Sequence, residues 1–145
     1  MTDQLLQYAK EQLHSGNFTC VLWDGVTALT TQQRGIQPLR GWLGSEKDVS
    51  AFVAADRVVG KAAAYLYVLL KIKAVYAEIV SKPAQEVLAR YGIPLEYGTL
   101  VDAIQNRAKD GFCPMERAVW EIDSPEQALV AIERTYQALT KKETP

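Results

Sequence analysis

A glycine and a lysine stand where a polar stretch of the chain runs into its most apolar segment. In ADRVVGKAAAYLYVLL, Gly60 and Lys61 precede nine apolar residues, 62–70. The exposed N–H groups and positive end of a helix favour an anion there, and a glycine lets a ligand approach the backbone closely. Lys61 would add a full charge, and Arg57 would add a planar guanidinium suited to phosphate or carboxylate. The pattern therefore predicts a small anion-binding site.

Other polar residues are expected near the same site. Ser81 and Lys82 open the next predicted helix, and ligands collect beyond the carboxyl ends of parallel strands, so both are expected to join Arg57 and Lys61 in one cleft, unless Lys82 is simply solvated. The alternatives are that Gly60 only allows tight packing, Lys61 extends to solvent and Ser81 only caps its helix. The expected ligand-binding residues are Asp56, Arg57, Gly60, Lys61, Ser81, Asn106 and Arg107.

A second interpretation gives this region a chemical reaction. Lys61 or Cys113 would act as a nucleophile on a small metabolite without a metal, and Glu116 or Asp56 would handle protons. Against it, a lone cysteine is more often a small buried hydrophobic residue, and a glutamate near arginines more often forms an ion pair. The sequence leaves both interpretations open.

Composition and charge narrow the classes of function. The 145 residues are expected to form one domain, 1–145, and a net charge of −1 argues against broad nucleic-acid binding. The longest apolar run has nine residues, whereas a bilayer span needs roughly 20. The first residues lack the features of a signal peptide, and two cysteines make no disulfide framework. We expect a cytoplasmic protein with no membrane partner, and apolar residues on its terminal helices are compatible with a homodimer.

Hydrophobic periodicity and turn residues predict the elements that position these residues. Asp24-Gly25 joins two β-prone runs, 18–23 and 26–31, as a hairpin, and Ser124 caps a last helix. Helices are predicted at 3–14, 38–43, 61–71, 83–91 and 100–107, and further strands at 50–55, 74–80 and 93–97, with a turn at Asp56-Arg57. This order predicts an α/β fold, a three-layer α/β/α sandwich with a mixed sheet.

The order of hairpin, helix, strand, helix and strand resembles the cytidine-deaminase-like fold. The stretches AADRVVGKAAA at 54–64 and CPME at 113–116 are also similar to a small uncharacterised prokaryotic family of that fold. Deaminases hold zinc through His-x-Glu or Cys-x-Glu at one helix start and Pro-Cys-x-x-Cys at the next. The matching positions here read GKAA at 60–63 and PAQEV at 83–87, without metal ligands.

The resemblance therefore implies a domain with a deaminase fold but no zinc. Lys61 would repel a cation, and one histidine with two distant cysteines is too few for an ordinary zinc site, so no metal and no cofactor are expected. Together with Lys61 at a helix start, the resemblance implies binding of a small anionic metabolite, with nucleotide-like compounds among the candidates.

Overall fold

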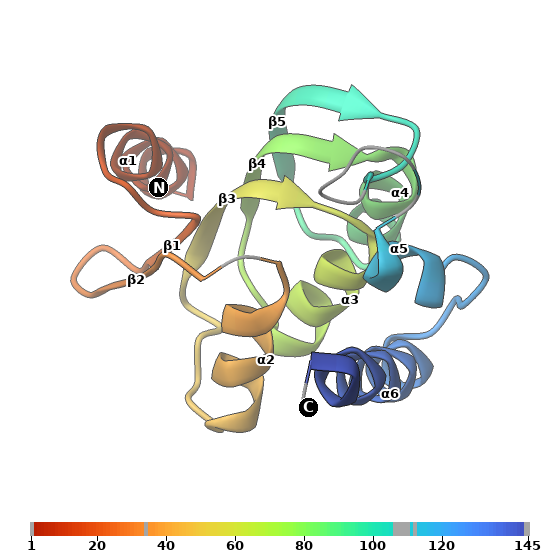
Figure 1. Cartoon of the computed structure of the whole chain (residues 1–145). Helices are drawn as coiled ribbons and strands as arrows, with labels where there is room; N and C mark the ends of the chain where they lie inside the picture. Colours follow the sequence, from red (N-terminus) through yellow and green to blue (C-terminus); the bar gives the residue numbers. More distant parts are fainter. Residues whose placement is uncertain (1, 34, 106–110, 112, 144–145) are drawn as a thin grey trace.

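The computed structural model describes residues 2–33, 35–105, 111 and 113–143. Six helices and five strands are seen in these residues (Figure 1). In chain order they are α1 (Thr2–Ser15), β1 (Cys20–Trp23), β2 (Ala28–Thr31), α2 (Gln37–Gly44), β3 (Val53–Val59), α3 (Lys61–Leu70), β4 (Val75–Ser81), α4 (Lys82–Arg90), β5 (Leu95–Val101), α5 (Pro114–Ala118) and α6 (Pro125–Glu143).

The strands form one mixed sheet in the order β2-β1-β3-β4-β5. β1 runs antiparallel to both β2 and β3, whereas β3, β4 and β5 are parallel to one another. The predicted hairpin is present, and the Asp24 carboxylate closes it by accepting hydrogen bonds from the N–H groups of Val26 and Thr27 (2.8 and 2.6 Å). Gly25 takes the positive φ (100°) that this turn requires.

Helices cover the sheet on both faces, as predicted for this α/β fold. α1 packs one face through an apolar stripe that includes Leu6, Ala9 and Leu13. The larger core lies on the other face, where α3 and α4 pack with α2 and α6 (Figure 1). α3 is buried on almost every side, which explains why its sequence is apolar all round. The Gly60-Lys61 start of α3 follows directly from the end of β3.

Two predicted segments differ from the structure. The helix predicted at 100–107 is wrong at its start, because Leu100 and Val101 belong to β5 and pair with Val80 and Ser81 of β4; pairing along the sheet outweighs a weak helical pattern. The turn predicted at Asp56-Arg57 is also wrong, since β3 runs through both residues to Val59. Neighbouring strands and buried partners satisfy these polar residues, so the strand need not end at them.

A polar clamp holds α2 against α6. The Arg40 guanidinium donates from Nε and Nη2 to the two carboxylate oxygens of Glu133, both at 2.7 Å, and lies 3.6 Å from the centre of the Tyr136 ring. Gln37 donates to the Tyr136 hydroxyl at 2.9 Å. These contacts fix the first turn of α2, which matters for the site below. Of the helices described, none combines the length and apolar character needed to cross a bilayer.

Candidate functional site

A cavity of about 700 Å³ lies where β1, β3 and the starts of α2 and α3 meet α5. Five predicted site residues line it: Asp56, Arg57, Gly60, Cys113 and Glu116. Lys61 and Ser81 are not part of the described wall, and Asn106 and Arg107 lie outside the described residues. Apolar side chains form much of the remaining wall, among them Phe18, Ile36, Pro38, Ile104 and Met115.

Asp56 lies in β3 at the centre of the sheet and is only 9% exposed. Its Oδ2 accepts a 2.7 Å hydrogen bond from the Tyr67 hydroxyl on α3, and that hydroxyl lies 3.4 Å from the Cys20 sulfur on β1. Burial raises the pKa of Asp56 to about 7, although the bond from Tyr67 partly opposes the shift. Near neutral pH this carboxyl is therefore able to take up or give a proton.

Glu116 lies on α5, covers the start of α3 and is 1% exposed. Its Oε2 accepts a long hydrogen bond, 3.4 Å, from the backbone N–H of Lys61. Its Oε1 is buried and has no hydrogen-bond partner among the described residues. Burial raises the pKa of Glu116, which the nearby Ser81 hydroxyl and backbone N–H groups partly oppose. A Cβ at Gly60 would collide with Glu116 Oε2, so this close approach requires a glycine.

The start of α3 therefore faces a carboxyl group of the chain itself instead of an external anion. The Lys61 ammonium does not point into the cavity wall; it donates a 2.7 Å hydrogen bond to the backbone oxygen of Trp120. Burial lowers the pKa of Lys61, and the nearby Arg90 adds to this effect. The structure does not bring Lys61 to a place where it could hold a ligand in this cavity.

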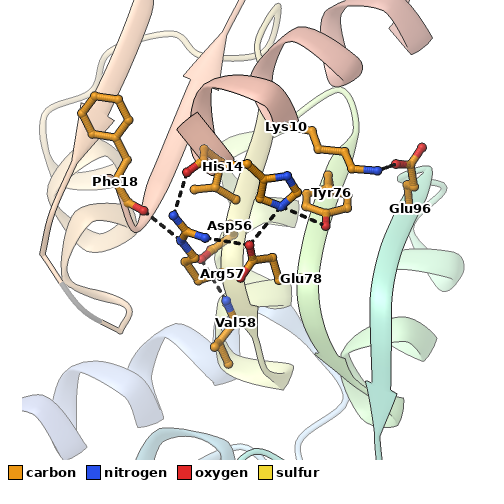
Figure 2. A network of polar contacts seen from close by, with 10 residues as sticks. Lys10, His14, Phe18, Asp56, Arg57, Val58, Tyr76, Glu78 and Glu96 are labelled. Atoms are coloured by element: carbon orange, nitrogen blue, oxygen red, sulfur yellow. Dashed lines mark hydrogen bonds and ion pairs between the residues drawn. The ribbon is translucent and has the colours of Figure 1, made fainter. Parts of the chain in front are cut away.

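The Arg57 guanidinium is used within the protein (Figure 2). It donates to the backbone oxygens of Phe18 (3.0 Å) and Leu13 (2.7 Å) and to the carboxylate of Glu78 (2.7 Å). His14 also contacts that carboxylate, at 3.0 Å. Arg57 therefore fastens the end of α1 to the sheet, and its guanidinium bonds to partners within the protein. This is a structural role that the sequence did not predict.

The other predicted residues have more ordinary surroundings. Ser81 is buried and caps α4 by accepting a hydrogen bond from the N–H of Ala84 (3.3 Å), which is the alternative considered for it. Cys113 is half-buried and directly precedes α5. Within the described ranges, no group of three His, Cys, Asp or Glu side chains is arranged to hold a metal ion.

Two residues of the site were not predicted from the sequence. Tyr67 and Cys20 contact each other and connect through the Tyr67 hydroxyl to Asp56, yet their residue types were consistent with simple packing. The available signal was a tyrosine inside an otherwise apolar helix, because a buried hydroxyl needs a hydrogen-bond partner.

Comparisons with known proteins place the chain among relatives that carry no assigned activity. The model of the TM1506 family, described as a domain of unknown function (DUF1893), matches residues 8–135. A solved structure of a DUF1893 family protein (TM1506) from Thermotoga maritima is 23% identical, covers 90% of this chain and 89% of that chain, and has a TM-score of 0.84. No curated protein matches. At this identity the likeness shows a shared fold alone.

Proposed function

The chain belongs to the DUF1893 family, and we propose that its domain binds a small metabolite in the cavity beside Gly60. The unpartnered Oε1 of Glu116, buried in the wall of that cavity, is the observation that carries this proposal. A buried polar atom without a partner costs about 1–3 kcal/mol, which a ligand that donates a hydrogen bond would recover. The cavity volume of about 700 Å³ is within the range of small-molecule sites.

We also propose that the domain has a deaminase-like fold and holds no zinc. In zinc-dependent deaminases, two adjacent helix starts hold the metal. The corresponding starts here are those of α3 and α4, and Glu116 accepts a hydrogen bond from the first while Ser81 of the second lies near its carboxyl. A carboxyl group would thus occupy the place of the metal. An anionic or nucleotide-like ligand stays a prediction. The charged groups of Lys61 and Arg57, on which that prediction depends, are bonded to partners within the protein.

Filling the cavity should abolish ligand binding without unfolding the protein. A broad panel of amines, sugars, nucleosides, carboxylates and phosphates is screened by thermal stability, because a ligand that binds only the folded state raises it. Val58 is 42% exposed and lines the cavity, so Val58→Trp should remove the stabilisation that a hit gives to the wild type.

The matched control is Ile79→Trp. Ile79 pairs with Val58 across β3 and β4, has a similar exposure of 37%, and is not part of the cavity wall. It should bind the hit as the wild type does. A panel without a single stabilising compound, or hits that Val58→Trp leaves unchanged, would refute the cavity as the binding site.

A metal-free enzyme is the second candidate, favoured by one observation: Cys113 and Glu116 line the same cavity three positions apart. The Cys113 sulfur would add to a carbonyl carbon, and its proton would pass through Glu116 to the carbonyl oxygen. If so, iodoacetamide should label Cys113 faster than it labels a free thiol, and Glu116→Gln should slow this labelling. A rate equal to that of a free thiol would exclude the candidate. Lys61 is the weaker nucleophile because its ammonium contacts Trp120.

A further inference from the structure

The cavity wall carries two buried carboxyl groups, Asp56 and Glu116, and no free positive charge among the residues that the structure describes. Arg57 is the one cationic residue in this described wall. Its guanidinium is bonded to Leu13, Phe18 and Glu78. In the part of the wall that the structure describes, the ionisable groups left to meet a ligand are therefore mainly carboxyl groups.

The wall also has hydrogen-bond acceptors that could accept further hydrogen bonds. Glu116 Oε1 has no hydrogen-bond partner among the described residues, and Asp56 Oδ1 receives a long bond of 3.4 Å from the N–H of Val58. A phosphate or carboxylate brought here would meet like charges and further acceptors, without compensation for its own desolvation. A ligand that donates hydrogen bonds satisfies the groups that are present.

We propose that the cavity binds a small organic cation, an amine, amidine or guanidine, whose N–H groups bond to Glu116 and Asp56. The inference rests on the proposed function, because it names the ligand class of the same cavity. Opposite charges attract strongly in a partly dry site, and each charged partner offsets the desolvation of the other. The apolar wall formed by Phe18, Ile36 and Met115 would pack against the hydrocarbon part of the ligand.

Binding of a cation should release a proton. Burial raises the pKa of Asp56 to about 7, so part of this group is protonated near neutral pH, and burial also raises the pKa of Glu116. Tyr67 and Cys20 face Asp56, and their own pKa values are raised well above the usual range, so both remain neutral. A bound cation favours the ionised carboxylate, which expels the proton.

The groups around Glu116 do not reverse the expected release of a proton when a cation binds. Glu116 is approached by the Ser81 hydroxyl and by the N–H groups of Lys61 and Ile104, none of which titrates near neutral pH, and by the charge of the Lys61 ammonium. For one proton released from a group with a pKa near 7, affinity should rise about tenfold between about pH 6 and pH 8.

Three compounds with one carbon skeleton separate the ligand classes. Putrescine is a dication, 1,4-butanediol is neutral and succinate is an anion, and titration calorimetry compares their binding to the wild type. We expect putrescine to bind at least about tenfold more tightly than the diol, and we expect succinate not to bind. The heat of putrescine binding should differ between phosphate and Tris buffers, because the released proton is taken up by the buffer.

Variants then test the acceptors. Glu116→Gln and Asp56→Asn should each weaken putrescine binding and reduce proton release, a readout that a purely structural role would not change. Asp102→Asn is the control: Asp102 is exposed, pairs with Lys82 and lies outside the cavity wall, so its variant should bind as the wild type does.

Different results would contradict the ligand class and the cavity as a binding site. Tighter binding of succinate or the diol, lost in Val58→Trp, would overturn the ligand class and leave the cavity as a site. Putrescine binding that is absent at millimolar concentration, or independent of pH, would also overturn the inference. Only failure of the whole panel would remove the cavity function itself.

Discussion

The free energy of unfolding should fall by about 4 kcal/mol as the pH rises from about 4 to above 7, through Asp56 alone. Burial raises its pKa from 3.8 to about 7, so the folded state binds the proton more tightly than the unfolded state. The stabilisation is complete below the unfolded pKa and is lost as the pH passes the folded pKa. Glu116 acts in the same direction, because its pKa is also raised. Urea unfolding at a series of pH values measures the effect.

Two variants identify the group responsible. Asp56→Asn keeps an acceptor for the Tyr67 hydroxyl but does not titrate, so it should flatten the pH dependence and raise stability above pH 7 relative to the wild type. Asp24→Asn is the contrast, since hydrogen bonds from Thr27 and Val26 lower the pKa of Asp24 and its contribution is lost as the pH falls. An unchanged slope in Asp56→Asn would show that Asp56 is not the titrating group.

The second large effect is expected from Gly60→Ala. The new methyl group would meet Glu116 Oε2 and come within 3.0 Å of Ile104 Cγ1, so the buried carboxyl group must move. Overpacking of this kind costs about 1–3 kcal/mol. The backbone of Gly60 is extended, with φ −95°, so the loss comes from the contact and not from backbone strain. Thermal or urea unfolding provides the measurement.

Gly41→Ala is the matched control for this substitution. Gly41 lies inside α2, and a Cβ there would meet no atom within 4 Å. Alanine should therefore stabilise the protein by about 0.5–1 kcal/mol, because it favours the helix and restricts the unfolded chain. Equal stability changes in Gly60→Ala and Gly41→Ala would contradict the contact between Gly60 and Glu116.

Much of the fold was predictable because its signals are local. The Asp24-Gly25 turn, the apolar stripe of α1 and the apolar segment of α3 each define an element within a few residues. Leu100 and Val101 were assigned wrongly because their strand depends on pairing with β4, which lies some 20 residues earlier in the chain. A local pattern cannot contain that information.

The candidate site was predictable in position more than in charge. The sequence drew attention to Gly60, Asp56 and Glu116, and the structure places all three at one cavity. The sequence could not show that the Lys61 ammonium bonds to a backbone oxygen and that the Arg57 guanidinium bonds to Glu78, because those partners come from distant segments. Side-chain direction at a helix start or along a strand is decided by such long-range partners.

Arg57 and Asp56 are consecutive residues of β3, and their side chains serve opposite sides of the sheet. One holds the amino-terminal helix, and the other faces the cavity. One peptide bond of β3 therefore separates the residue that holds α1 from the residue that faces the cavity. A change that loosens the amino-terminal helix would therefore reach the residue next to Asp56, even though that helix contributes no residue to the described cavity wall.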